Sequence, residues 1–303
     1  MQRHWRLEMA NKEAYKQISE SKKIIKDVMQ ANLTEIADEI IRQVMVNFRK
    51  YSDAYKLNAI KNINPPGLLA YRKELLSALA VVASDAIKQA RKEVPRAKSV
   101  RLEEKIETIM LGEFEDLPVA LRKRILAQSD LLVDTQLADL EKAIYFQYAS
   151  DVGDPVTEAH LQVDMEEKAY AYIEGTSVET GAGLIGAEMV NEARSAFFFD
   201  DEVLNEIVAF EFVNGDPVSL ICQSLAGLVF DKNDPMIGAY TPPLHFNCKS
   251  YIVPILSLDK GMKIEKFTPR SIEGKSNADI LKSIQFAETI KHCSCCAENF
   301  NSF

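Results

Sequence analysis

The N-terminal half of the chain carries apolar residues at the spacing of a single helix face. Between residues 11 and 64 there is neither glycine nor proline. Apolar residues recur there in steps of three and four, at Ile25, Met29, Leu33, Ile36, Ile40, Val44 and Phe48. This periodicity predicts one long amphipathic helix, or two helices stacked end to end. Pro65-Pro66-Gly67 ends the pattern, because a proline disfavours the helical conformation of the preceding residue and donates no backbone hydrogen bond.

Two further long helices are predicted before residue 150. One runs from about Leu68 to Glu93 and stops near Pro95. Another begins after Pro118, which suits the first turn of a helix because its missing N–H would be unpaired there. Its apolar positions are Val133, Leu137, Leu140 and Ile144. Long helices with few breaks predict an elongated antiparallel bundle for residues 1–150.

Beyond residue 153 the predicted elements are shorter, and strand patterns appear. We expect a helix around residues 161–173, a Gly/Ser/Thr loop up to Gly183, and a helix over about residues 186–199. Strands are predicted over residues 207–213, 228–230 and 250–256, with a turn at Asn214-Gly215-Asp216-Pro217. The predicted fold is therefore α+β and predominantly α-helical. Its expected parts are a helical bundle domain (1–150), a small helix-plus-antiparallel-sheet module (151–257) and a flexible Cys-containing tail (258–303).

Residues 181–186, Gly-Ala-Gly-Leu-Ile-Gly, match the G-x-G-x-x-G fingerprint of dinucleotide-binding proteins. That fingerprint works by placing a pyrophosphate on a helix N-terminus at the end of a buried parallel strand. The preceding residues 174–180 are polar and acidic and do not have the pattern of a strand. We therefore expect no nucleotide site here.

The formal net charge of −9 is unevenly distributed. Residues 1–150 contain 25 Lys and Arg against 21 Asp and Glu, a balance of +4, whereas residues 151–303 contain 11 against 24, a balance of −13. The basic excess is greatest over residues 88–101, where Glu93 is the single acid. This segment is either a solvated helix face and loop or a surface that contacts double-stranded DNA. The candidate DNA contacts are Lys88, Arg91, Lys92, Arg96, Lys98 and Arg101.

Three residues of the C-terminal half have the types and spacing of metal ligands: Cys222, His245 and Cys248. They would leave a zinc ion one ligand short of the four that closed structural sites use. The alternative is that both cysteines are small buried residues and that His245 hydrogen-bonds the surrounding loop. A fourth ligand would have to come from the tail segment His292-Cys293-Ser294-Cys295-Cys296. Because the cysteine count of five is odd, complete disulfide pairing within one chain is excluded.

Catalytic motifs are missing from the sequence. It contains no H-E-x-x-H, no Walker loop and no G-x-S-x-G. The longest strongly apolar stretch, Leu75 to Ala83, is far short of the roughly 20 residues that a membrane-spanning helix needs. We expect neither an enzyme nor a membrane partner.

The arrangement of Phe210 to Val213, Asp216 to Gly227 and Pro242 to Ser250 resembles the C-terminal signature of phage Mu F-like minor head proteins. That signature joins an aspartate-led turn and a Cys-x-x-Leu-x-Gly element to a downstream Pro-Pro-x-His-x-Asn-Cys-Arg element. The matching residues are Asp216, Cys222, Leu225, Gly227, Pro242, Pro243, His245, Asn247 and Cys248. Lys249 stands in place of the common Arg. Many members carry two further cysteines where this chain has Ser219 and Ser250, so the thiols that would close a metal site are depleted.

The resemblance implies a minor capsid (head morphogenesis) protein of a tailed phage, made in the host cytoplasm and located in the virion, inside the capsid near the portal. The implied partner is the portal protein, with packaged double-stranded DNA and the major capsid protein as further candidates. The implied role is in assembly, packaging or DNA ejection, without catalysis and without a cofactor. About 45 residues follow the predicted module, fewer than a typical domain contains, so we expect no fused enzyme. Two alternatives stay open: a DNA-binding protein using residues 88–101, and a metal-dependent enzyme using Cys222, His245 and Cys248, with zinc as the metal.

Overall fold

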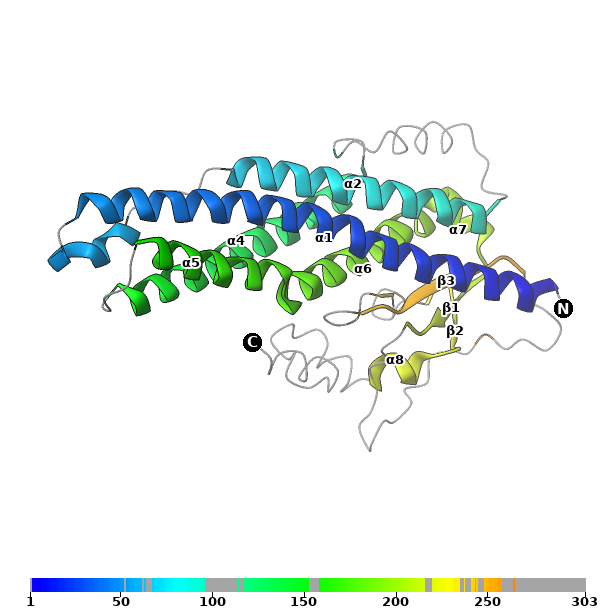
Figure 1. Cartoon of the computed structure of the whole chain (residues 1–303). Helices are drawn as coiled ribbons and strands as arrows, with labels where there is room; N and C mark the ends of the chain where they lie inside the picture. The colour runs from blue at the N-terminus through cyan, green and yellow to red at the C-terminus, as the bar shows by residue number, and fades with distance from the viewer. Residues whose placement is uncertain are drawn as a thin grey trace. The chain divides into compact units, whose positions relative to one another are not determined.

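The computed structural model describes most of the chain up to residue 257 (Figure 1). The described residues are 2–51, 53–61, 63, 67–95, 114, 117–152, 158–215, 220–234, 237, 241–242, 244, 248–257 and 264. The helices are α1 (Gln2–Lys50), the 3-10 helix η1 (Asp53–Ile60), α2 (Leu68–Glu93), α4 (Val119–Asp151), α5 (Glu158–Glu174), α6 (Thr176–Phe198), α7 (Asp201–Glu206) and α8 (Leu220–Leu225). The strands are β1 (Ala209–Val213), β2 (Val229–Asp231) and β3 (Tyr251–Ile255). The fold is thus predominantly helical α+β with a small antiparallel sheet, as predicted.

The chain divides into two compact units. Unit 1 comprises residues 1–22, 79–123 and 183–303, and unit 2 comprises residues 23–78 and 124–182. Each of the helices α1, α2, α4 and α6 contributes residues to both units. The grouping therefore does not follow the order of the chain.

Unit 2 is a helical bundle that buries the predicted apolar faces. Six of the seven apolar positions predicted on α1 are at most 2% exposed: Ile25, Met29, Leu33, Ile36, Ile40 and Val44. Polar contacts link the same helices along their length. Asn32 Nδ2 of α1 donates to Glu74 Oε2 of α2 at 2.7 Å, and Gln30 Nε2 donates to the backbone oxygen of Ile173 in α5 at 3.2 Å. Burial of this periodic face is the main stabilising contribution in such a bundle.

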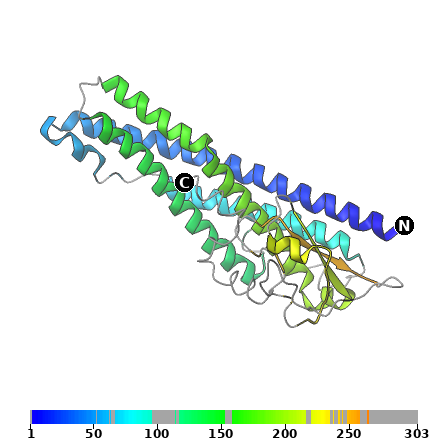
Figure 2. The ribbon, with the colours of Figure 1, turned by 90° about the horizontal axis from the view of Figure 1, so that it is seen from below.

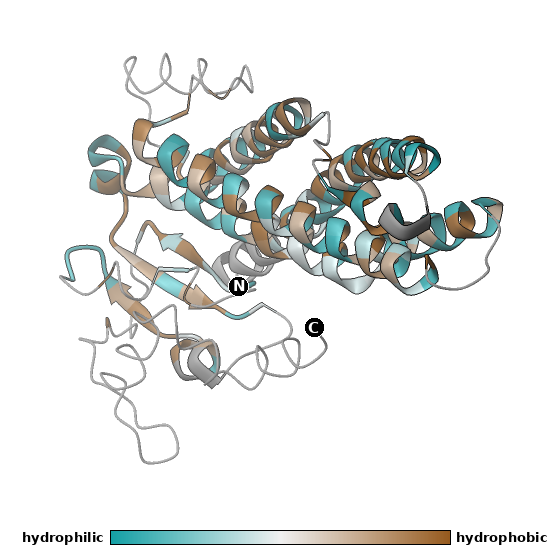
Figure 3. Cartoon of the chain, turned by 90° about the vertical axis from the view of Figure 1, so that its left-hand side faces the viewer, coloured by the Kyte–Doolittle hydropathy of each residue, from teal (hydrophilic) through white to brown (hydrophobic). Residues whose placement is uncertain are grey.

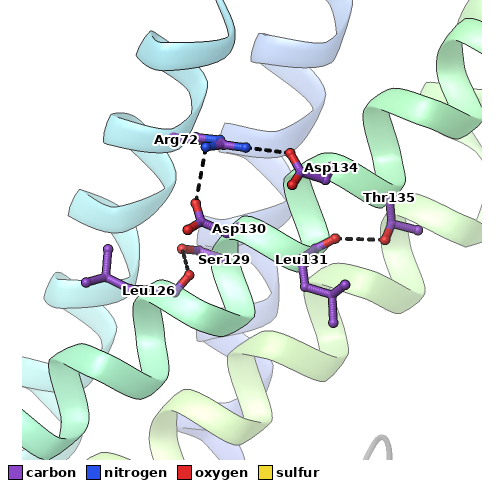
Figure 4. Close-up of polar contacts among 7 residues, drawn as sticks. All are labelled: Arg72, Leu126, Ser129, Asp130, Leu131, Asp134 and Thr135. Atoms are coloured by element: carbon purple, nitrogen blue, oxygen red, sulfur yellow. Dashed lines mark hydrogen bonds and ion pairs between the residues drawn. The ribbon is translucent and has the colours of Figure 1, made fainter.

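Helices α2 and α4 of unit 2 are joined by a set of ion pairs around Arg72 (Figure 4). Arg72 Nη2 lies 2.5 Å from Asp134 Oδ1, and Nη1 lies 3.6 Å from Asp130 Oδ1. The two aspartates are four residues apart and therefore lie on one face of α4. Deeper between the helices, the Tyr71 hydroxyl donates to Gln136 Oε1 at 2.6 Å. The register of α2 against α4 is therefore fixed by two partly exposed ion pairs and one buried hydrogen bond.

Unit 1 contains the sheet, whose strands lie in the order β2-β1-β3 with both pairs antiparallel. Phe210 of β1 lies opposite Phe230 of β2 and opposite Pro254 of β3. Proline fits there because β3 is an edge strand, where the missing N–H breaks no ladder. All five residues of β3 are buried. The strands are mostly hydrophobic, whereas hydrophobic and hydrophilic residues are interspersed along the helices (Figure 3).

The sheet packs beside the C-terminal part of α6 (Figure 2). The Phe210 ring lies 6.0 Å from that of Phe198 and 5.2 Å from that of Phe199, measured between centroids. Between α6 and β1, Asp200 caps the short helix α7, since its side chain accepts a hydrogen bond from the Glu202 N–H at 3.2 Å. The sequence pattern predicts neither α7 nor α8. Cys222 lies within α8.

The predicted loop before Gly183 is wrong, because α6 already begins at Thr176. The glycines of this segment serve close packing. In unit 2, a Cβ added to Gly181 would lie 3.2 Å from Leu132 Cδ1, and in unit 1 a Cβ added to Gly186 would lie 2.8 Å from Ser21 Oγ. The G-x-G-x-x-G match therefore lies inside a helix, where it lacks the strand-to-helix turn that a dinucleotide site needs.

The structure also shows where the first predicted helix ends and where one residue of the predicted tail lies. Helix α1 ends at Lys50 and is followed by η1, although residues 51–64 contain no glycine or proline. Ile264, which lies in the predicted tail, packs against the sheet cluster of Ala209, Val229 and Ile255. Among the described helices, none is both long enough and apolar enough to cross a membrane.

Candidate functional site

The two cysteines of the family-like signature meet inside unit 1. Cys222 lies in α8, and Cys248 lies just before β3. Their exposed fractions are 2% and 0%, and their Sγ atoms are 3.7 Å apart. Neither sulfur atom is part of a disulfide bond. Among the described residues, Cys222 and Cys248 thus bring the two halves of the signature into contact.

Two other signature residues have a structural role that follows from their conformation. Leu225, the last residue of α8, is 2% exposed. Gly227 has a φ of +71°, a left-handed conformation that residues with a Cβ rarely adopt. Its N–H donates to the backbone oxygen of Phe212 at 2.9 Å, and Phe212 donates back to Leu228 at 2.9 Å. Gly227 therefore turns the chain from α8 into β2 while pairing it with β1.

The turn after β1 approaches the backbone before β3 very closely. A Cβ added to Gly215 would lie 2.2 Å from the backbone oxygen of Lys249 and 2.4 Å from its carbonyl carbon. The Gly215 N–H also donates to Ser250 Oγ at 3.4 Å. Only a glycine permits this approach. It holds the segment that carries Cys248 against the end of β1.

Helix α6 anchors β3 and the residues before it through buried polar side chains. Asn191 Nδ2 donates to the backbone oxygen of Ser250 at 2.9 Å. Arg194 Nη1 and Nη2 donate to the two carboxylate oxygens of Glu93 at 2.7 and 2.9 Å, and Nη2 also donates to the backbone oxygen of Ile252 at 3.2 Å. The Arg194 and Glu93 side chains are only 1% and 7% exposed. This bidentate ion pair connects the end of α2, α6 and β3.

Burial changes the acid–base properties of this centre. It raises the pKa of the Glu93 carboxyl, and the charge of Arg194 opposes that shift. A hydrogen bond with the Cys222 thiol lowers the pKa of Cys248, while burial acts in the opposite direction. The pKa of the Tyr251 hydroxyl is raised by burial. Of these groups, the Cys248 thiol has the shift that favours its reactive, ionised form.

Of the three candidate metal ligands, the structure describes Cys222 and Cys248. Across the described residues, no group of three or more His, Cys, Asp or Glu side chains lies close enough together to hold a metal ion. His245 and the cysteines of the tail lie outside the described residues, as do the signature residues Asp216, Pro243 and Asn247. Pro242 is described and is buried. Cys222 and Cys248 could supply two thiolate ligands, so a zinc site would depend on residues outside the described ranges.

The candidate DNA contacts are described only at the end of α2. Lys88 Nζ pairs with Asp85 Oδ1 at 3.0 Å, and Arg91 and Lys92 lie in the last turn of the helix. Glu93, the one acid of the basic segment, pairs with Arg194 in the interior. The other three candidates, Arg96, Lys98 and Arg101, lie outside the described residues. DNA contact by this segment stays a prediction.

The sequence predicted no role in this centre for the polar residues Glu93, Asn191, Arg194 and Ser250, or for the close approach at Gly215. A signal for one of them was present. Arg194 follows the buried residues Ala187 and Val190 at helical spacing, which places it on the buried face of α6. A charged residue on such a face requires a buried partner of opposite charge.

Comparison of the chain with models of known protein families, with curated proteins and with solved structures gave no match.

Proposed function

We propose that this chain is a minor capsid (head morphogenesis) protein of a tailed phage, associated with the portal inside the head. Its role lies in assembly, packaging or DNA ejection, and it carries out no catalysis of its own. The portal protein is its direct partner, with packaged double-stranded DNA and the major capsid protein as its surroundings.

One observation supports the proposal beyond the resemblance of residues 210–254 to the Mu F-like signature. Cys222 and Cys248, from the two halves of the signature, touch in the interior, and Gly227 pairs with β1. A shared role in building one folding module would explain why these residues occur together in a sequence signature. In this proposal the module provides a rigid fold, and the helices provide the surface that docks on the portal.

A structural role also agrees with the surroundings of the signature cysteines. Both side chains are almost completely buried, whereas a catalytic thiol must reach a substrate. The Asn191 and Arg194 contacts hold backbone oxygens of Ser250 and Ile252, and therefore fix the path of the chain. These residues stabilise the module in which the signature lies.

The proposal is tested by co-expression with the portal protein of the same phage. We expect the chain to sediment with a tagged portal oligomer through a gradient at low salt, and not to sediment at that position when the portal is omitted. Mass spectrometry of purified, protease-treated particles should then detect the chain in a few copies per particle. A chain that never sediments with the portal, and that protease removes from particles, is not a portal-associated head protein.

A variant identifies the part of the chain that docks. Gly215→Val disrupts the approach to Lys249 in the sheet module, whereas Gly183→Ala changes a buried position where the added Cβ would lie 3.5 Å from the Lys22 side chain, and serves as the matched control. If the helices dock on the portal, both variants sediment with it. In the absence of portal, duplex DNA binding that weakens steeply with added salt would instead favour the DNA-binding alternative.

A further inference from the structure

Cys222 and Cys248 are close enough to react with each other. Their Sγ atoms are 3.7 Å apart, which is van der Waals contact. A disulfide has an S–S length of about 2.05 Å, so the sulfur atoms would need to approach by about 1.7 Å. Side-chain rotation and a small backbone shift cover such a distance. The two residues lie 26 positions apart, so the bond would link α8 to the start of β3.

The backbone around the pair keeps the two sulfur atoms together. Gly227 pairs the end of α8 with β1, and Gly215 brings the end of β1 against Lys249, the residue next to Cys248. Leu225, the last residue of α8, is also buried, with 2% of its surface exposed. Proximity of two thiols raises their effective concentration for each other far above that of any dissolved thiol.

We propose that Cys222 and Cys248 form a redox-active dithiol site that is oxidised to an intramolecular disulfide by a small-molecule disulfide such as oxidised glutathione. The thiolate of one cysteine attacks a sulfur atom of the small disulfide and releases one small thiol. The thiolate of the other cysteine then attacks the protein sulfur of the mixed disulfide and releases the second small thiol. The protein loses two electrons and two protons. The small disulfide takes up these electrons and protons and is released as two small thiols.

The burial of the pair sets the rate of this reaction. With exposed fractions of 2% and 0%, the thiols meet a small disulfide only after α8 opens locally. Once formed, the disulfide is protected from reducing agents by the same packing. If the chain is a head protein, as proposed above, it is made in the reducing host cytoplasm and meets an oxidising medium after release of the particle. Only this timing rests on the proposed function; the dithiol chemistry does not.

The test uses the full chain with Cys293, Cys295 and Cys296 replaced by Ser, so that the buried pair holds the only thiols. The reduced protein is incubated in glutathione buffers of increasing oxidised fraction, quenched in acid, unfolded and alkylated. Intact mass spectrometry counts the remaining thiols, and peptide mapping identifies any linked peptides. We expect both thiols to disappear together, with loss of two hydrogen atoms, no glutathione adduct, and a linked peptide pair containing Cys222 and Cys248.

Single variants in the same background provide the controls. Cys222→Ala and Cys248→Ala should each accumulate a glutathione adduct on the remaining cysteine and form no link within the chain. Oxidation of the parent should raise its thermal midpoint by about 5–10 °C, because the closed loop restricts the unfolded chain, and the single variants should not show this increase.

Three results would overturn the proposal. The first is a parent protein whose thiols stay unmodified at every glutathione ratio. The second is accumulation of adducts on both cysteines without a linked peptide. The third is stoichiometric zinc in the purified reduced parent that is lost in Cys222→Ala, which would make the sulfur atoms metal ligands. None of these results bears on sedimentation with the portal, so failure here is distinct from failure of the proposed function.

Discussion

The sheet region of unit 1 and the helical bundle of unit 2 are each stabilised internally by a different kind of polar contact. In unit 1, the Arg194–Glu93 pair is buried, with side chains 1% and 7% exposed. In unit 2, the Arg72–Asp134 pair is partly exposed, with side chains 33% and 59% exposed. Both contacts join an arginine to a carboxylate at hydrogen-bond distance, but solvent screens the second and not the first.

The two units therefore depend on different sources of stability, apolar helix faces in unit 2 and buried polar contacts in unit 1. The bundle depends on apolar faces that repeat along each helix, and its ion pairs add little to them. The sheet has only three short strands and reaches a defined arrangement through buried polar contacts from α2 and α6. Such contacts cost desolvation energy, and loss of one partner leaves the other buried and unpaired. We therefore expect large effects of polar substitutions in unit 1 and small effects in unit 2.

The largest effect is expected for Arg194→Met, which leaves the Glu93 carboxylate buried without a cation. We expect the free energy of unfolding to fall by about 3–5 kcal/mol, measured by urea denaturation. The double variant Arg194→Met with Glu93→Leu should recover most of that loss, because it removes both charges from the interior. If the double variant were as unstable as the sum of the single variants, the pair would not act as a unit.

The next effect is expected for Gly215→Ala. The added Cβ would lie 2.2 Å from the Lys249 backbone oxygen, so the chain must shift, at a cost of about 1–3 kcal/mol. Gly183→Ala is the matched control, because its Cβ would meet only the Lys22 side chain at 3.5 Å. In the interior of α6 that substitution should stabilise the protein by about 1 kcal/mol. Equal effects of the two substitutions in thermal unfolding would contradict the close approach at Gly215.

A smaller effect is expected inside the bundle for Tyr71→Phe. The substitution removes the hydroxyl that donates to Gln136 Oε1 and leaves that buried oxygen unsatisfied, at a cost of about 1–2 kcal/mol. Adding Gln136→Leu should restore part of the loss, because no unpaired polar group then stays in the interior. A Tyr71→Phe variant as stable as the parent protein would show that water replaces the hydroxyl.

The smallest effect is expected for Arg72→Ala, which removes both ion pairs with Asp130 and Asp134 (Figure 4). Because these pairs are partly exposed, we expect a loss of about 0–1 kcal/mol, and less at high salt. The measurement is urea denaturation at low and high salt. A loss as large as that of Arg194→Met would remove the distinction between the two units.

Local patterns in the sequence determined most of the secondary structure. The periodic apolar residues and the prolines predict α2 over Leu68–Glu93 and the start of α4 after Pro118, as observed. The β-branched and aromatic runs predict the three strands to within two residues at either end. These elements were predictable because spacing and turn residues act over a few neighbouring positions. The loop predicted before Gly183 was wrong because of the glycines in α6. Glycine occurs both at breaks in the chain and where helices pack closely, and the sequence alone does not distinguish the two.

The tertiary structure alone decided which side chains meet. Glu93 was read from the sequence as one acid in a basic surface segment, yet it pairs with Arg194, 101 residues away. Cys222 and Cys248 were placed in one signature by resemblance, but their contact, across 26 residues, appears only after α8 and the sheet are in place. Periodicity assigns a residue to a face of an element and does not specify the opposing element. The buried partner of a charge or a thiol is therefore decided by packing between distant segments, where desolvation makes a correct pairing matter most.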